Sequence, residues 1–388
     1  MQVLAIKKII IASRFGRFFD SKLRLILSFI PFVHSIMSIE KVIKKPDSFV
    51  FFLYGGIGDV VLTLPLINKL SSICKVTIFC DSTVLNLTFL FPENAKVVVY
   101  KKNTLLSDCS ELRNQIKGLN PVFVQTSPIF EVYILRALLR IPYAIGLTTS
   151  FNSIRTLGFR SEPLHIASLS RLATYETIFT AIVDRFSFHN FFSDNNSKAK
   201  NLALENFFLN NNNKYIVIST TKSAQWDMGK MADYEYMKLA EYIVKNHKFK
   251  VLFVGHKSER DDIDHMLAGS LGNHMIENVA GDTSLEELAS IMKKAEFVIA
   301  NDNGVSHMSS YLGLKTLVLF MFSDPSVYTW NNDNYSYIFN KKHDCMPCVG
   351  LNRYPQDNYP VFCKNQLVCN ETINSSYIIK KLETLHWL

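Results

Sequence analysis

From residue 49 onward, short apolar runs without internal alternation are separated by longer stretches in which apolar residues recur at helical spacing. The apolar runs are residues 49–54, 75–80, 96–100 and 121–126, and then 214–220, 250–255, 275–280, 297–302 and 315–320. Strands that are apolar along their whole length are typical of parallel sheets covered by helices on both faces. The pattern therefore predicts an α/β protein, with helices between the strands, for example at 105–117 and 129–140.

The polar, asparagine-rich stretch 193–214 divides this pattern into two series. Such a stretch is typical of a linker or a surface loop between domains. We therefore expect two successive doubly wound, Rossmann-like units, at 49–205 and 206–374. In the second unit, Ser284-Leu-Glu-Glu287 is a capping box that predicts the start of a helix before the strand at 297–302.

A different pattern fills residues 1–48, where lysines and arginines are interleaved with aromatic and aliphatic residues. At helical spacing this gives a basic amphipathic extension, which suits the surface of an anionic membrane. A helix packed on the body of the protein with its charges in solvent is the other interpretation, and the sequence does not separate the two. No apolar run reaches the roughly 18 residues needed to span a bilayer, and no cleavage site of a secretory signal is apparent. We expect a cytoplasmic protein, peripheral on an anionic membrane surface if this extension binds lipid.

Composition adds a charge preference to this picture. The chain has 388 residues, of which 48% are hydrophobic and 20% charged, as expected for a globular protein of two domains with full cores. Its formal net charge is +8. An excess of positive charge suits an anionic partner, such as nucleic acid, a phosphorylated sugar or an acidic membrane surface, without choosing among them.

The glycine-rich turn after the first predicted strand resembles half of a dinucleotide fingerprint, because Gly56 and Gly58 have its spacing. A nicotinamide-dependent Rossmann oxidoreductase is therefore one candidate function. Two residues oppose it. Val61 stands where the fingerprint has glycine or alanine, and Asp59 would lie in the phosphate pocket, where two anions a few ångström apart repel by about 4 kcal/mol.

Asp59 has two better interpretations. An aspartate at a helix start caps free amides and meets the positive end of the helix dipole. The alternative is chemical: Gly55, Gly56 and Gly58 leave its carboxylate open to a ligand at the carboxyl end of a strand, where a general base would be well placed.

A second candidate site follows the strand at 297–302, in the stretch Asn301-Asp302-Asn303-Gly304 and the helix expected after it. Free amides at this turn could hold a diphosphate. Asp302 could orient a hydroxyl or amide of a ligand, and His307, one turn into the helix, would point at the same place. Separately, the two residues read as an ordinary cap and a satisfied histidine; together at one turn they favour a ligand site.

These two turns resemble those of glycosyltransferase family 9, the heptosyltransferases of lipopolysaccharide core synthesis. The stretch "GGIGDVVLTLPLI" (55–67) resembles the N-terminal glycine–aspartate turn of the family, and "FVIANDNGVSHMSSYLGLKTLVLFMFSDP" (297–325) resembles its signature. The stretch "VAGDTSLEELASIMKKA" (279–295) agrees with the lead-in to that signature. The resemblance extends from about Phe49 to Tyr328 and does not include the first 48 residues.

The resemblance implies a GT-B fold, with two Rossmann-like domains facing each other across a cleft. It implies an inverting, metal-independent transfer of heptose from ADP-heptose to a sugar hydroxyl of the lipid A–core acceptor, with no cofactor and no nucleic-acid partner. Asp59 would be the general base, on the acceptor side with its glycine turn. The donor would be bound by residues of the second domain, namely Thr220, Thr221, Lys222, Glu259, Asp302, Asn303, Gly304 and His307.

The chain departs from the family pattern at one charged position. Many members have a lysine two residues before a tryptophan; here Ala224 precedes Trp226, and Lys222 or Lys230 would supply the charge instead. A GT-B enzyme using another nucleotide sugar is therefore the first alternative. A non-catalytic saccharide-binding protein is another, and it predicts that loss of Asp59 changes no turnover.

Four late cysteines, Cys345, Cys348, Cys363 and Cys369, form a cysteine-rich loop at 345–369. One pair has the spacing of a zinc knuckle and the other is looser, so a structural metal site competes with reduced thiols that pack a long loop, the interpretation we favour. The last segment, 375–388, is expected to form a helix that packs back on the first domain, as in GT-B enzymes.

Overall fold

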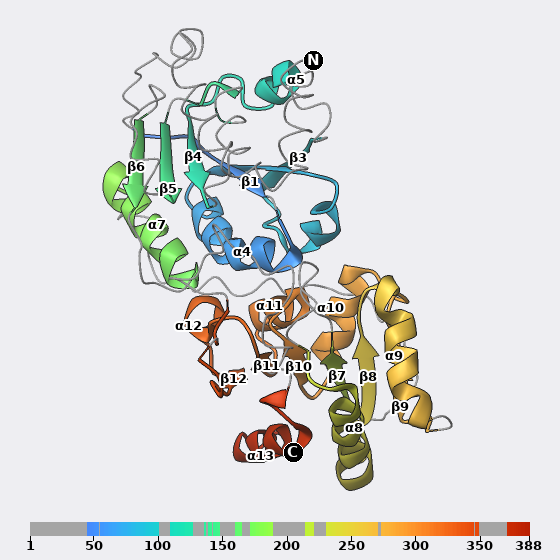
Figure 1. Cartoon of the computed structure of the whole chain (residues 1–388). Coiled ribbons are helices and arrows are strands. Elements are labelled where there is room, and N and C mark those ends of the chain that lie inside the picture. The colour runs from blue at the N-terminus through green and yellow to red at the C-terminus, as the bar shows by residue number, and fades with distance from the viewer. Residues whose placement is uncertain are drawn as a thin grey trace, which may run out of the picture.

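The computed structural model shows two α/β domains, one above the other in Figure 1. It describes residues 45–53, 55–100, 109–126, 136, 139–141, 143–147, 160–164, 171–188, 214–220, 230–270, 273–344, 346–348 and 371–388. Most of the basic extension at 1–48, most of the predicted helix at 129–140 and most of the cysteine-rich loop lie outside these residues.

The first domain is a six-stranded parallel sheet in the order β3-β2-β1-β4-β5-β6. Its strands are β1 (Ser48–Leu53), β2 (Lys75–Cys80), β3 (Ala95–Val99), β4 (Pro121–Gln125), β5 (Tyr143–Leu147) and β6 (Arg160–Leu164). Its helical elements are α4 (Ile57–Ser71), η1 (Leu85–Leu90), α5 (Cys109–Asn114) and α7 (Arg171–Phe186).

Strand β1 shows why these strands are apolar throughout. Phe49, Phe51 and Leu53 belong to the cluster that contains α4 and α7, whereas Val50 and Phe52 pack with residues of and just after α5 on the other face. All five side chains are buried, because helices cover both faces of the sheet.

The second domain has a six-stranded parallel sheet in the order β12-β11-β10-β7-β8-β9. Its strands are β7 (Tyr215–Ser219), β8 (Lys250–Val254), β9 (Ile276–Asn278), β10 (Val298–Asn301), β11 (Thr316–Phe320) and β12 (Tyr335–Phe339). Its helical elements are α8 (Asp233–His247), η4 (Lys257–Glu259), α9 (Arg260–Leu267), η5 (Ala268–Ser270), α10 (Leu285–Lys294), α11 (Gly304–Tyr311), α12 (Pro325–Tyr328) and α13 (Ser375–Thr384).

Both sheets have the same strand order once each is counted from its own first strand, and this is the order of Rossmann folds. In such sheets ligands bind beyond the carboxyl ends of the strands, where the strand order reverses. That point lies between β1 and β4 in the first domain and between β7 and β10 in the second. Asp59 follows β1, Thr220 follows β7 and Asp302 follows β10, so all three residues lie at a reversal point.

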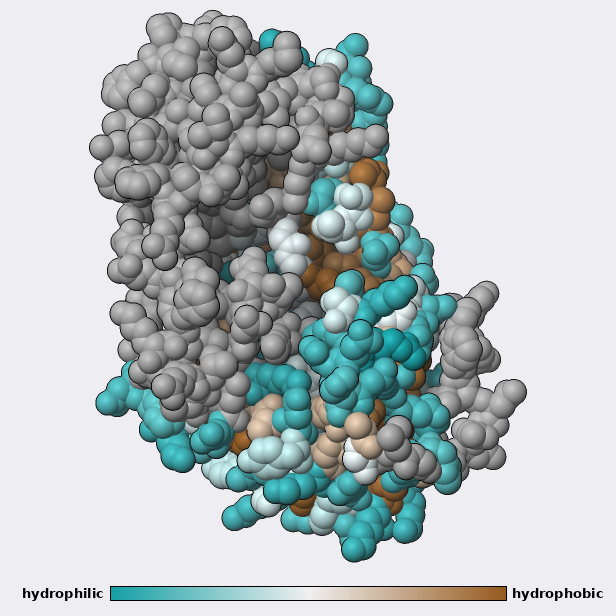
Figure 2. All heavy atoms as spheres, turned by 45° about the vertical axis from the view of Figure 1, so that its right-hand side comes forward, coloured by the Kyte–Doolittle hydropathy of each residue, from teal (hydrophilic) through white to brown (hydrophobic). Residues whose placement is uncertain are grey.

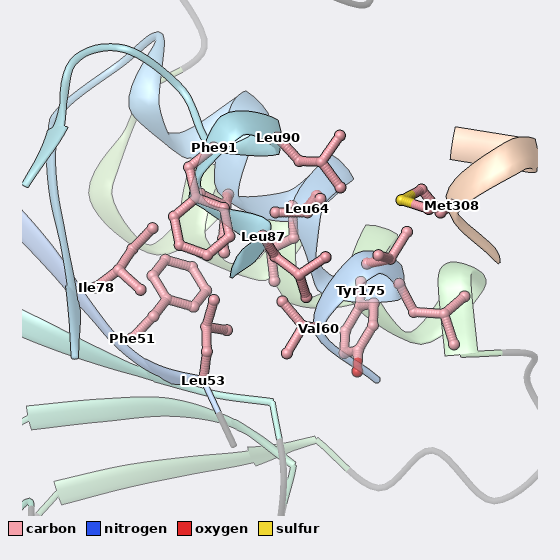
Figure 3. Packing of buried hydrophobic residues seen from close by; sticks show 14 of the residues in the cluster. Phe51, Leu53, Val60, Leu64, Ile78, Leu87, Leu90, Phe91, Tyr175 and Met308 are labelled. Carbon is pink, nitrogen blue, oxygen red and sulfur yellow. The ribbon is translucent and has the colours of Figure 1, made fainter. Parts of the chain in front are cut away.

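The two domains share an apolar core. Helix α4 lies against α11, and η1 lies against α10, as Figure 1 shows. One continuous buried cluster runs from β1 and α4 to Met308 of α11 and Leu288 of α10. Met308, Leu64 and Leu90 all belong to this cluster, and Figure 3 shows their side chains. On the face presented by Figure 2, a hydrophobic patch separates hydrophilic surface above it from hydrophilic surface below it.

Helix α13 corrects one expectation from the sequence. Among the described residues it packs on the second domain and not on the first; Ile378 and Leu382 join the buried cluster that contains residues of α8. Figure 1 shows α13 at the end of the molecule opposite the first domain. The reason is a polar anchor: Glu235 of α8 accepts hydrogen bonds from the amide and the hydroxyl of Ser375, at 2.8 and 2.5 Å.

None of the helices in the described part of the chain is long and apolar enough to cross a membrane.

Candidate active site

Asp59 lies in the first turn of α4, but it is not the helix cap. The N-cap is Gly56, which has no side chain to offer, and Oδ1 of Asp59 instead accepts a hydrogen bond from Nη1 of Arg171 at 2.7 Å. The Asp59 side chain is 47% exposed. Gly55 has a φ of +115°, and a Cβ there would lie 3.1 Å from Oδ2 of Asp59. The glycine therefore keeps space beside the carboxylate.

Asp302 lies at the carboxyl end of β10 and is enclosed by its neighbours. Oδ2 accepts a hydrogen bond from the hydroxyl of Ser323 at 2.5 Å, and Oδ1 lies 3.4 Å from Nε2 of His307. The Asp302 side chain is only 10% exposed. Burial, with the Asp302 charge as a second cause, raises the pKa of the nearby Tyr335 hydroxyl.

His307 is held in one tautomer by Trp330. The indole Nε1 of Trp330 donates to Nδ1 of His307 at 3.0 Å, and an indole N–H can only donate. The proton of this buried imidazole is therefore on Nε2, the nitrogen that faces Asp302. His307 and Asp302 thus lie side by side, with 3.4 Å between Nε2 and Oδ1, and we call this pair the Asp302–His307 unit.

The amides at this turn correct a second expectation. We expected free amides that could hold a diphosphate, but the Asn303 side chain caps the helix and accepts from the amides of Val305 and Ser306, at 2.9 and 3.1 Å. The amide of Asn303 itself donates to the Ser306 hydroxyl. Asparagine is a strong N-cap because its side-chain oxygen reaches these donors.

The two glycine-containing turns lie against each other across the domain boundary. A Cβ at Gly58 would lie 2.7 Å from Cδ2 of His307, and a Cβ at Gly304 would lie 2.7 Å from Cβ of Ile57. Each domain therefore supplies a glycine that receives a side chain of the other. This contact brings Asp59 and the Asp302–His307 unit, which are far apart in the sequence, to one place.

A buried hydrogen-bond network connects the ends of β7 and β10. Tyr236 donates to Oδ1 of Asn301 at 3.0 Å, and Nδ2 of Asn301 donates to the carbonyl of Thr220 at 3.1 Å. Nδ2 of Asn303 donates to the Ser219 hydroxyl at 3.2 Å. Thr220 is thereby placed beside the Asp302 turn.

Other donor-side candidates are placed less directly. Thr221 and Lys222 lie outside the described residues. Lys230 forms an ion pair with Asp233 at 2.5 Å. Glu259 follows β8, and its Oε2 accepts from the amide of His256 at 2.8 Å in a capping box, so the carboxylate caps the start of η4.

Arg171 and Trp330 carry no sequence signal of their own, and Ser323 lies in the signature stretch but was not indicated as a site residue. Arg171 is the first residue of α7, in a segment without a motif. Ser323 and Trp330 flank α12 and contact Asp302 and His307. We call residues 323–330 the α12 segment. The sequence signal that could have indicated a role for the α12 segment is its position after the strand of the signature, β11.

Cys348 is half-buried, and the other three late cysteines lie outside the described residues. Among the described residues, no group of three or more histidine, cysteine, aspartate or glutamate side chains is arranged to hold a metal ion.

Several solved structures are similar to this chain. The crystal structure of the family 9 glycosyltransferase from Veillonella parvula DSM 2008 has a TM-score of 0.66 at 15% identity, over 88% of this chain and 97% of that one. E. coli ADP-heptose lps heptosyltransferase II also has a TM-score of 0.66, at 14% identity, over 87% and 98%. E. coli heptosyltransferase WaaC with ADP-2-deoxy-2-fluoro heptose has a TM-score of 0.61, at 12% identity, over 87% and 99%. No curated protein matches the sequence.

The two Rossmann-like domains and the similarity to these structures show that the chain has the GT-B fold. The model of glycosyltransferase family 9 (heptosyltransferase) matches residues 160–356, about half of the chain. The chain belongs to glycosyltransferase family 9, as its two turns indicated.

Proposed function

We propose that this protein transfers heptose from ADP-heptose to a sugar hydroxyl of a lipopolysaccharide lipid A–core acceptor, with inversion at the anomeric carbon and without a metal ion. One observation carries the proposal: the Asp59 turn of the first domain meets the Asp302–His307 turn of the second through Gly58 and His307. A group transfer needs a base and a donor site in contact, and this junction supplies both.

Asp59 is the general base of this proposal. Its carboxylate takes the proton of the acceptor hydroxyl while the hydroxyl oxygen forms a bond to the anomeric carbon of heptose. The bond between that carbon and the diphosphate breaks at the same time, and ADP leaves with the bonding electrons. The half-exposed position of Asp59, beside glycines, leaves room for a sugar at the carboxylate.

The donor lies on the second domain in this proposal. Asp302 and His307 are suited to sugar hydroxyls, because a carboxylate accepts and the Nε2–H of His307 donates. With the amides of Val305 and Ser306 occupied by Asn303, the diphosphate needs other donors. Thr220 with the following Thr221 and Lys222 supplies these in our proposal, together with Gly304. Glu259 is assigned to the adenosine end, beyond β8.

The partners follow from this assignment. The acceptor is anchored in a membrane, so we place the enzyme in the cytoplasm, peripheral on the inner face of the inner membrane. The net charge of +8 favours such an anionic surface. The basic extension at 1–48 is the segment proposed to hold it there.

The test has two parts. A panel of nucleotide sugars is titrated by calorimetry, with and without a truncated core acceptor, and ADP-heptose is expected to bind tightest. Asp59→Ala is expected to keep this binding and to lose transfer by on the order of 100-fold or more. Asp261→Asn, which removes the charge of another first-turn aspartate, is the matched control and is expected to keep full turnover.

Each rival has its own result. Tighter binding of a different nucleotide sugar would assign a related GT-B reaction. Binding of NADH, seen as a change in its fluorescence, would indicate the oxidoreductase. Unaltered turnover in Asp59→Ala would show that Asp59 is not the base.

A further inference from the structure

Asp59 does not stand alone at the junction: the guanidinium of Arg171, at the start of α7, donates from Nη1 to its Oδ1 at 2.7 Å. Hydrogen bonds between an arginine and a carboxylate are strong and directional, so the bond fixes the plane of the carboxylate. The Arg171 side chain is 24% exposed, half as much as that of Asp59. The more buried partner is therefore the one suited to orient the other.

The second domain supports Arg171. Its guanidinium carbon lies 5.7 Å from the centre of the Tyr328 ring, a distance at which a cation is attracted to an aromatic face. Tyr328 is the last residue of α12, and α12 begins with an Asp324 cap and Pro325. Arg171 thus connects a carboxylate of the first domain to an aromatic ring of the second.

The α12 segment contacts three residues of the candidate site, one of them from the first domain. Ser323 bonds Asp302, Tyr328 lies beside Arg171, and Trp330 bonds His307. A shift of this segment would therefore move Asp302 and His307 on the donor side. Through Arg171 it would also change the orientation of Asp59. In this arrangement the orientation of Asp59 depends on the second domain.

The two oxygens of Asp59 are placed differently by these contacts. Arg171 engages Oδ1, whereas Oδ2 lies on the side of Gly55, where the missing Cβ leaves space. A proton acceptor needs one oxygen directed at the substrate hydroxyl. The geometry leaves Oδ2 for that role.

We propose that Arg171 is a positioning residue: it holds Oδ1 of Asp59, presents Oδ2 to the acceptor hydroxyl, and does so in an orientation set by Tyr328 of the second domain. The proposal rests on Asp59 as the general base. It adds a residue to the site that acts through Asp59 rather than on the substrate.

If Arg171 has only a structural role, the expected effect of its substitution is different. If Arg171 only tied α7 to α4, removing another tie between the same helices would have the same effect. Lys69 of α4 forms an ion pair with Glu176 of α7 at 2.5 Å, so Lys69→Gln is the matched control. A half-exposed pair of either kind contributes little to stability.

The experiment measures kcat, the acceptor KM and the affinity for ADP-heptose of the full chain. Arg171→Gln is expected to lower kcat on the order of 10- to 100-fold, with donor affinity within about twofold, because misdirection of a base costs rate and not donor binding. Arg171→Lys is expected to recover at least about threefold of that loss, since lysine can still donate to Oδ1. Lys69→Gln is expected to keep the wild-type kcat.

The role of Tyr328 is tested in the same assay. Tyr328→Phe keeps the aromatic face and is expected to keep kcat within about twofold. Tyr328→Leu removes that face and is expected to lower kcat several-fold. Equal rates for the two variants would overturn the part assigned to the second domain.

A double variant decides whether Arg171 acts through Asp59. Starting from the residual rate of Asp59→Ala, adding Arg171→Gln is expected to cause no further loss. A further loss as large as in the wild-type background would overturn the proposal, and so would an Arg171→Gln enzyme with normal kcat and a raised acceptor KM. If Asp59→Ala keeps full turnover, the assignment of the base fails; if Asp59→Ala is inactive and Arg171→Gln is normal, only the positioning role fails.

Discussion

His307 of the second domain occupies the space that a side chain on Gly58 of the first domain would need. A Cβ added to Gly58 would lie 2.7 Å from Cδ2 of His307, closer than real Cβ contacts. His307 cannot easily yield, because it is buried and bonded to Trp330. The identity of residue 58 therefore controls how closely the two halves of the candidate site approach.

Gly58→Ala is expected to separate the two turns and to lower transfer on the order of 10- to 100-fold, because displacement of reacting groups by even about 1 Å is costly. It is also expected to reduce the free energy of unfolding by about 1–3 kcal/mol through overpacking. Activity assays and thermal unfolding measure the two effects.

Gly269→Ala is the matched control for this substitution. Gly269 has no positive φ, and a Cβ there would meet nothing within 4 Å. Wild-type rates in both variants would show that the contact between Gly58 and His307 does not set the geometry of the reaction.

Trp330→Phe keeps an aromatic ring beside His307 but removes the indole donor that fixes its tautomer. A lost hydrogen bond of this kind is worth about 1 kcal/mol, so we expect kcat/KM for the donor to fall about three- to tenfold. Steady-state kinetics with varied ADP-heptose measures this. Trp387→Phe, made at the C-terminal tail where the ring packs near Phe297, is expected to leave kcat/KM unchanged.

Glu235 gives the protein a stability contribution that depends on pH. Burial alone would raise the pKa of this carboxyl, but the hydrogen bonds from Ser375 and the charge of Lys238 outweigh it and hold the pKa below its usual 4.5. A carboxyl with a lowered pKa in the folded state stabilises the protein above its unfolded pKa, and this contribution is lost as the pH falls through the folded value.

Glu235→Gln is therefore expected to lower the free energy of unfolding by about 2 kcal/mol at pH 7 and by less below pH 4.5. Denaturant unfolding at the two pH values measures the difference. The exposed Glu241 of the same helix is the control, and Glu241→Gln is expected to have little effect at either pH. A pH-independent loss in Glu235→Gln would show that the charge of Glu235 is not what anchors α13.

Removal of metal ions is expected to leave transfer unchanged, because the proposed mechanism uses a carboxylate base and protein groups for the diphosphate. The measurement is turnover after dialysis against EDTA. Loss of turnover that magnesium restores would contradict the metal-independent part of the proposed function.

The sequence predicts nine of the strands from their apolar runs. In β1, β4, β7, β10 and β11 every residue is buried, because these strands lie in the interior of their sheets. The sequence misses β5, β6 and β12 for local reasons. Strand β5 contains Gly146, whose φ of +137° and close approach to the Gln125 carbonyl exclude any larger residue. Strands β6 and β12 lie at the edges of their sheets, where polar residues and, in β6, a proline are tolerated.

The candidate site divides in the same way. Asp59, Asp302 and His307 belong to short motifs that directly follow a predicted strand, so the local sequence is enough to indicate them as candidates. Arg171, Tyr328 and Trp330 act through contacts between distant segments, and single residues of these types carry no pattern. The expected free amides at Val305 and Ser306 fail for another reason, because Asn303 satisfies them within its own turn.

The buried cluster that runs from α4 into α10 and α11 limits how the protein can be divided. Either half, made by itself, would present to water the apolar surface that now lies against its neighbour. We expect such halves to aggregate when expressed separately and to regain solubility when they are produced together. Any movement between the two halves is accordingly expected to be a rotation or a slide, because a wide separation would expose that apolar surface to water.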